Sequence, residues 1–100
     1  MTTRWTFKPG SAEEAFGVTK DEVLPVLEAR QGYLDTAIVQ TGTNSFLSFV
    51  RWECEDDATQ ALMGLAPLVI RYLGHLVRDV ERFSGPVVYT GSSHTSGVLE

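Results

Sequence analysis

The sequence predicts one small α+β domain whose elements follow the order βαββαβ. The chain has 100 residues, of which 43% are apolar and 21% charged, as in an ordinary globular domain. Two neighbouring β-branched runs with a glycine-containing turn between them predict a hairpin. Segments with apolar residues at three- and four-residue steps lie on both sides of that hairpin and predict helices.

The first strand and the first helix are expected before residue 32. Residues 4–8 alternate between polar and apolar side chains and are followed by Pro-Gly, which predicts a short strand and a turn. An apolar stripe that includes Phe16 then predicts a helix that begins after Ser11 and ends at Gly32, a typical C-cap residue. Pro25 lacks a backbone N–H, so we expect a kink or a break near it.

The predicted hairpin consists of residues 34–41 and 45–53. Because side chains alternate along a strand, Leu47 and Phe49 lie on one face of the second strand. The other face carries Phe46, Ser48, Val50 and Trp52. Both faces of the sheet are therefore apolar, and helices on one side alone would leave Leu47 and Phe49 uncovered.

The second half of the chain predicts two helices and a last strand. Acidic residues open a short helix at 55–65, and an apolar stripe predicts a longer helix over 68–83. Residues 87–90 are β-branched and aromatic and predict the fourth strand. The domain is expected to span residues 1–91, with a polar C-terminal tail at 92–100.

This order is that of a ferredoxin-like fold, a four-stranded antiparallel sheet with helices on one face. Two copies can bury their uncovered sheet faces against each other and close a dimeric α/β barrel. Such an interface buries on the order of 2,000 Å² or more. We therefore expect a homodimer. The alternative is that the C-terminal tail or the sheet edge shelters Leu47 and Phe49.

Charge and missing motifs disfavour several functions. The formal net charge of -5 repels phosphate backbones and anionic lipids, so neither nucleic acid nor membrane is expected as a partner. The N-terminal segment has no signal-peptide pattern and Cys54 is a lone cysteine, which predicts a cytoplasmic protein without a metal or thiol redox site. Nucleotide, flavin and serine-hydrolase motifs are absent from the sequence, so no cofactor is expected.

Four strings of the sequence resemble one family: KPGSAEEA, ARQGYL, VRWECEDDA and LVRDVERFSGPVVYTG. In their order and spacing, over about residues 4–91, they look like the antibiotic biosynthesis monooxygenase type of dimeric α/β barrel. The resemblance implies a cofactor-independent pocket between sheet and helices. It also implies that Trp52 stands at the family's tryptophan position and that Asn44 is a candidate for its asparagine. Relatives that degrade haem have a histidine where this chain has Leu62, so haem cleavage is disfavoured.

Aromatic side chains are the main candidates for a site. The indole of Trp52 offers a π face and one N–H donor, and the phenol of Tyr72 on an apolar stripe needs a buried partner or a ligand. We take these two as candidate catalytic residues, and Tyr33, Asn44 and Phe16 as candidate substrate-binding residues. For each aromatic residue, simple packing is the alternative.

The basic residues of the predicted helix at 68–83 are weaker candidates. Its face opposite the apolar stripe carries Arg71, His75, Arg78 and Arg82. These residues could bind an anion, but the interleaved Asp79 and Glu81 are typical of an ordinary solvent face. His94 lies in the predicted tail.

Two functions fit these observations. The first is a cofactorless monooxygenase that acts on an aromatic or polycyclic small molecule in a pocket between Tyr72 and Trp52. The second is a dimer of the same fold that binds a small aromatic ligand without turnover, which the shortage of a general base facing the pocket favours. A purely structural dimer with a filled core is a third possibility, and it predicts no pocket large enough for a ring.

Overall fold

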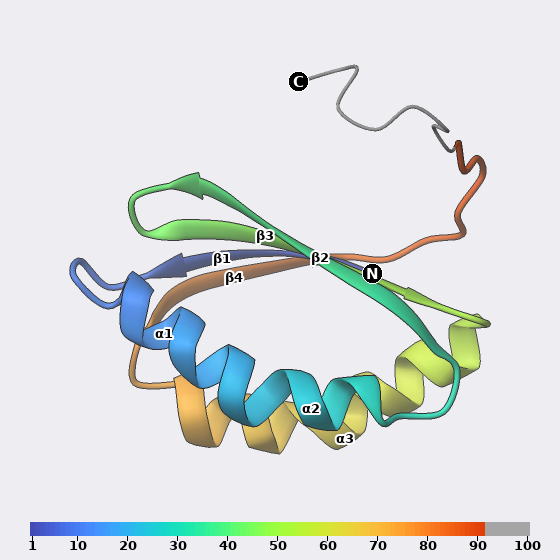
Figure 1. Cartoon of the computed structure of the whole chain (residues 1–100), viewed down its shortest axis with the longest axis horizontal. Helices are drawn as coiled ribbons and strands as arrows, with labels where there is room; N and C mark the ends of the chain where they lie inside the picture. The colour runs from blue at the N-terminus through green and yellow to red at the C-terminus, as the bar shows by residue number, and fades with distance from the viewer. Residues whose placement is uncertain (92–100) are drawn as a thin grey trace.

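A computed structural model describes residues 1–91 of the chain, and the tail predicted at 92–100, with His94, lies outside the described residues. The elements of the described part follow the predicted βαββαβ order (Figure 1). Their bounds are β1 Thr2–Phe7, α1 Ala12–Val18, η1 Thr19–Val23, α2 Leu24–Glu28, β2 Tyr33–Gly42, β3 Ser45–Trp52, α3 Glu55–Leu73 and β4 Val77–Phe83.

The four strands form one antiparallel sheet in the order β2-β3-β1-β4. All helices cover the same face of this sheet (Figure 1). The sheet is therefore the ferredoxin-like sheet that the sequence predicts. Its central strands β3 and β1 are paired on both sides, and β2 and β4 are its edges.

The first helical region bends where the sequence predicts. Between α1 and α2 the chain forms a turn of π-helix, η1, and Pro25 occupies the start of α2. The wider π turn tolerates the missing backbone N–H of Pro25. Gly32 follows with a positive φ of 81°, a left-handed conformation that glycine adopts without strain. The chain then turns directly into β2.

The helix in the second half differs from the prediction. Residues 55–65 belong to one continuous helix, α3, that passes through Pro67 and ends at Leu73. Pro67 is exposed, so water can bond the carbonyl group that proline leaves without a donor. The predicted break at Pro67 is therefore wrong.

The predicted helix over 68–83 and the predicted strand at 87–90 are also wrong. The chain leaves α3 at Gly74, turns over three residues, and forms β4 at Val77–Phe83. β4 pairs with β1 from Thr2↔Phe83 to Phe7↔Val77. An isolated helical stripe cannot compete with this ladder, because β1 needs a second antiparallel neighbour to satisfy its backbone. Residues 87–90 lie outside any strand.

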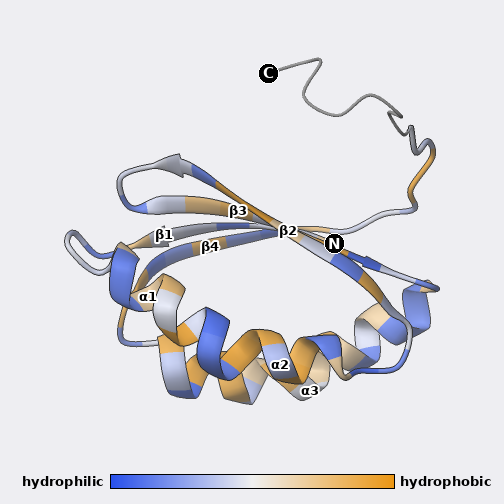
Figure 2. Cartoon of the chain, in the orientation of Figure 1, coloured by the Kyte–Doolittle hydropathy of each residue, from blue (hydrophilic) through white to orange (hydrophobic). Residues whose placement is uncertain are grey.

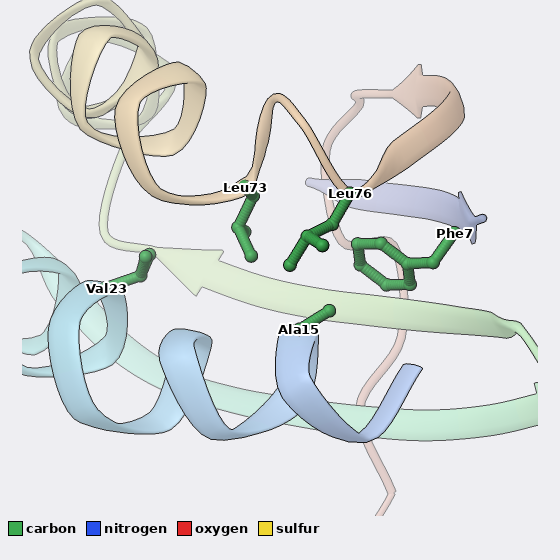
Figure 3. Packing of buried hydrophobic residues seen from close by; sticks show 5 residues of the cluster. All are labelled: Phe7, Ala15, Val23, Leu73 and Leu76. Carbon is green, nitrogen blue, oxygen red and sulfur yellow. The ribbon is translucent and has the colours of Figure 1, made fainter. Parts of the chain in front are cut away.

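The core lies between the sheet and the helices. One cluster contains buried residues from β1, α1, η1, the end of α3 and the turn after it, with Leu73 only 2% exposed (Figure 3). These residues are Phe7, Ala15, Val23, Leu73 and Leu76. A second cluster joins α2 to α3 through Leu27, Ala61 and Leu65. Figure 2 shows hydrophobic positions on the helices and along the strands.

No part of residues 1–91 covers the sheet face opposite the helices, which we call the open face. Register places Leu47 beside Val39 and Arg4, and Phe49 beside Ala37 and Thr2. Exposed apolar side chains on this face belong to Val39, Phe49 and Phe83. The predicted division of β3 into two apolar faces is therefore confirmed. Arg4–Glu81 and Arg51–Asp35 ion pairs also lie on the open face.

Candidate functional site

An apolar cavity of about 130 Å³ lies between the sheet and the helices. Its sheet side is lined by alternate residues of β1, β2 and β3, and its helix side by residues of α1, η1, α2 and α3. The lining includes the side chains of Trp5, Phe16, Thr36, Ser48, Trp52 and Ala61. The volume is close to that of an engineered apolar cavity of about 150 Å³ that binds benzene. One aromatic ring therefore fits.

Trp52 combines a cavity position with an unpaired donor. Trp52 is the last residue of β3 and lines the cavity. Its Nε1 is buried and has no hydrogen-bond partner among residues 1–91. A buried donor left unpaired costs about 1–3 kcal/mol. An N–H in this state is free to bond an acceptor on a ligand.

Neighbouring polar groups of the cavity are already paired. The Trp5 indole donates to Ser48 Oγ at 3.0 Å, and the Tyr33 hydroxyl bonds Thr36 Oγ1 at 2.7 Å. Trp5 and Trp52 thus differ: both line the cavity, but the N–H of Trp5 is satisfied by the protein. This contrast makes the unpaired Trp52 donor a specific feature of the site.

Tyr33 supports Trp52 from outside the cavity. Its ring stands edge-on to the Trp52 ring, with centroids 5.9 Å apart and planes at 80°, a favourable geometry for two aromatic rings. Register places Tyr33 directly opposite Trp52 at the end of the hairpin. Tyr33 is absent from the cavity lining and contacts the Trp52 ring from outside it.

A more open groove adjoins the cavity near the turn between β2 and β3. Asn44 and Glu13 line this groove, and Phe16, Ile38 and Phe46 line both hollows. The Phe16 and Phe46 rings stack with centroids 6.3 Å apart, and Phe16 is 45% exposed. The two rings therefore form the wall between cavity and groove. Phe16 and Asn44, both predicted as substrate-binding residues, are brought to the same groove.

Tyr72 lies outside both hollows. It packs against the core cluster, and the Arg71 guanidinium lies 5.5 Å from the centroid of its ring. The expected pocket between Tyr72 and Trp52 is therefore not formed. The cavity is covered instead by residues of η1, α2 and α3, because α3 runs across the sheet with Ala61 and Leu65 facing inward.

The predicted basic helix face does not exist, because only Arg71 is helical. His75 lies in the turn before β4, where its Nε2 is 3.8 Å from Glu14 Oε2. Arg78 and Arg82 lie on β4, and Arg82 lines the cavity with its guanidinium 6.0 Å from the centroid of the Trp5 ring. Sequence analysis missed Arg82 as a cavity residue. A strand predicted over 77–83 would have indicated this position of Arg82, because such a strand pairs Arg82 with Thr3 of β1.

Residues 1–91 contain neither a candidate metal site nor a candidate membrane-spanning helix. In this part of the chain, no group of three or more His, Cys, Asp or Glu residues is arranged to hold a metal ion. Over the same residues, every helix is too short or too polar to cross a membrane.

Comparison with known proteins adds information on the fold. No family model and no curated protein match the chain. A solved structure named "Putative antibiotic biosynthesis monooxygenase" from Nitrosomonas europaea superposes with a TM-score of 0.72 at 14% identity, covering 90% of each chain. One of the same name from Bacteriodes thetaiotaomicron gives 0.71 at 15% identity, covering 94% of this chain and 92% of that chain.

A second group of similar structures consists of NIPSNAP proteins. An uncharacterized NIPSNAP domain protein from Burkholderia xenovorans gives a TM-score of 0.63 at 14% identity, covering 91% of this chain and 96% of that one. The chain has the fold shared by these two groups. The expected resemblance to the monooxygenase group is thus confirmed at the level of the fold.

Proposed function

We propose that the chain is a cofactor-independent monooxygenase that acts on an aromatic small molecule bound beside Trp52. The observation that carries the proposal is the buried, unpaired Trp52 N–H at an apolar cavity of about 130 Å³. A ring in the cavity would bury its apolar surface and give Trp52 a carbonyl or phenol oxygen as acceptor. The fold of the solved structures named "Putative antibiotic biosynthesis monooxygenase" is consistent with this.

The adjoining groove extends the site to larger substrates. One ring fills the cavity, and a polycyclic substrate would continue past Phe16 towards Asn44. Phe16 is partly exposed and contacts Phe46 through one stacked face, so a change of its rotamer would join the two hollows. Phe16 and Asn44 then contact the rings that lie outside the cavity.

The proposed reaction needs molecular oxygen as its only co-reactant. An acidic ring CH₂ group loses a proton to give a carbanion, which transfers electrons to O₂ and forms a C–O bond. The resulting peroxide anion takes up a proton to give a hydroperoxide, which loses water to leave a C=O group, so one oxygen atom enters the product and the other leaves as water. The Trp52 N–H would stabilise the oxyanion into which the carbanion delocalises.

Oxygen uptake tests this function. Purified protein is incubated with anthrone in an oxygen electrode, and Trp52→Phe is compared with Ile70→Ala. Trp52→Phe keeps an aromatic ring but removes the N–H, so we expect uptake to fall by at least about tenfold. Ile70 is 71% exposed and outside both hollows, so Ile70→Ala should match the wild type. Equal uptake by wild type and Trp52→Phe would contradict the role of the donor.

A second function, binding without turnover, is favoured by a specific observation. Among residues 1–91, no Asp, Glu or His lines the cavity, and the groove offers one carboxylate, that of Glu13. The cavity thus lacks the positioned general base that most proton abstractions require. A thermal-shift screen of single-ring and polycyclic aromatics distinguishes the two functions. Ligands that raise Tm without oxygen uptake or product indicate a binding protein.

We further propose that the functional unit is a cytoplasmic homodimer formed through the open face. Phe49 is 39%, Val39 48% and Phe83 55% exposed on this face, and water contact with such a group of apolar side chains is unfavourable. A second copy of the same face is self-complementary under two-fold symmetry. Sedimentation of wild type and Phe49→Asp tests this. We expect a dimer and a monomer respectively, and a wild type that stays monomeric at all concentrations would contradict it.

A further inference from the structure

Arg82 brings a positive charge to the apolar cavity beside Trp52. It lies on β4, an edge strand of the sheet, and within residues 1–91 it is the one charged side chain that lines the cavity. The ion pairs of this part of the chain join other residues, so the Arg82 guanidinium has no carboxylate partner there. The charge is therefore available to a ligand.

The acidic residues nearest to Arg82 along β4 do not neutralise it. Glu81 is adjacent, but side chains alternate along a strand, so it faces the other side of the sheet. There it pairs with Arg4 at 3.5 Å. Asp79 lies on the same side as Glu81, for the same reason. In the described part of the chain, no Asp or Glu lines the cavity, which thus holds a cation without a counter-ion.

Register places Arg82 at the end of a polar row that crosses the floor of the cavity. Arg82 is across from Thr3, and Thr3 is across from Ser48. All three line the cavity, on strands about 4.8 Å apart. Ser48 Oγ accepts the Trp5 N–H at 3.0 Å, and a hydroxyl that accepts one hydrogen bond can still donate another. A guanidinium beside two hydroxyl groups suits an anionic oxygen group.

The position of the Arg82 guanidinium leaves its N–H groups able to donate. It lies over the Trp5 ring, 6.0 Å from the ring centroid, at about the limit of a cation–π contact. The N–H groups of a guanidinium lie in its own plane and match the two oxygens of a carboxylate. Trp52 is four residues beyond Ser48 on β3, about 13 Å of strand. Arg82 and Trp52 can therefore donate to separate parts of one ligand.

We propose that the cavity selects aromatic ligands that carry a carboxylate, and that Arg82 is the residue that binds this carboxylate. The inference rests on the proposed function in one respect, the aromatic ring bound beside Trp52. It names the substrate class of that site. A neutral molecule of the same shape leaves the guanidinium without a counter-ion, so it should bind more weakly.

Binding of two matched probes tests the inference. Cinnamate and cinnamamide have the same single ring and nearly the same shape, but only cinnamate is charged at neutral pH. Isothermal titration of the wild type should give a dissociation constant at least about tenfold lower for cinnamate than for cinnamamide. In Arg82→Gln, we expect the constant for cinnamate to rise by at least about tenfold and that for cinnamamide to stay within about twofold. Unchanged cinnamamide binding also shows that the variant keeps its cavity.

Arg78→Gln is the matched control. Arg78 lies on the same strand, is exposed and does not line the cavity. This variant changes the net charge by the same amount as Arg82→Gln and should bind both probes as the wild type does. Arg82→Lys keeps the charge but loses the planar fork of N–H groups, so it should retain part of the preference for cinnamate. Because Arg82 is exposed, added salt should reduce the preference in the wild type.

Several results would overturn the inference. The same preference for cinnamate in wild type and Arg82→Gln means that another group binds the carboxylate. Equal weakening of both probes in Arg82→Gln means that Arg82 shapes the cavity without recognising charge. A wild type that binds both probes equally refutes the carboxylate preference and leaves the ring site of the proposed function intact. A wild type that binds neither probe refutes the inference, and oxygen uptake with anthrone then decides the proposed function separately.

Discussion

Filling the cavity provides a quantitative test of whether it exists. Ala61 on α3 is 2% exposed and lines the cavity of about 130 Å³. Ala61→Leu adds three carbon atoms there, fewer than the six of the benzene ring that a comparable cavity accepts. Burial of these atoms contributes about 2.4 kcal/mol at about 0.8 kcal/mol each. Fixing the leucine rotamer costs about 0.5–1 kcal/mol.

The expected net gain in the free energy of unfolding is about 1.5 kcal/mol, which corresponds to a rise in Tm of about 6–12 °C for a domain of this size. Thermal denaturation measures it. The same leucine occupies the volume intended for a ring, so Ala61→Leu should also lose the Tm shift that an aromatic ligand gives to the wild type.

Ala58→Leu is the matched control. Ala58 is on the same helix, is 8% exposed and does not line the cavity, so the added atoms meet packed neighbours and cost about 1–3 kcal/mol. The reasoning is refuted if both variants lose stability to the same extent, because that result means that no empty space lies beside Ala61.

Three further predictions concern the fold. Leu73→Ala, which truncates a 2% exposed core residue, should lower the free energy of unfolding by about 2–5 kcal/mol in urea titrations; a loss below about 1 kcal/mol would contradict the core described above. Gly32→Ala should lower Tm, because Gly32 has a φ of 81° and a Cβ there would meet the Asp57 side chain; an unchanged Tm would contradict this. The side-chain hydrogen bond from Arg51 lowers the pKa of Asp35, so the pair stabilises the fold above the unfolded-state pKa of Asp35 and loses this contribution as pH falls through the folded-state pKa. The stability difference between wild type and Asp35→Asn should therefore disappear in acid unfolding curves, and a difference that persists at the lowest pH would contradict this.

Local sequence signals were sufficient for the hairpin and for the two faces of β3. Alternation places Leu47 and Phe49 opposite Phe46 and Trp52 whatever the rest of the chain does, because the side-chain period of a strand is fixed. Gly32 was predictable for a similar reason, since only glycine adopts a left-handed conformation freely. These features depend on a few neighbouring residues.

The strand β4 could not be predicted from its own residues. The apolar positions of 68–83 continue a helical stripe, and the change to a strand follows from pairing with β1, whose residues lie far away in the sequence, as in the pair Thr2↔Phe83. Residues 87–90 have the better strand composition but lie outside the sheet, because Val77–Phe83 occupies the edge beside β1. Tertiary pairing here outweighs local preference.

The candidate site divides in the same way. The sequence by itself determined that Trp52 shares a strand face with Phe46 and Val50, opposite Leu47 and Phe49. Only the tertiary structure decided that its N–H is left unpaired, that Tyr72 is excluded from the cavity and that Arg82 lines it. Hydrogen-bond satisfaction and cavity shape depend on every element packed around a side chain, and no local pattern in the sequence carries that information.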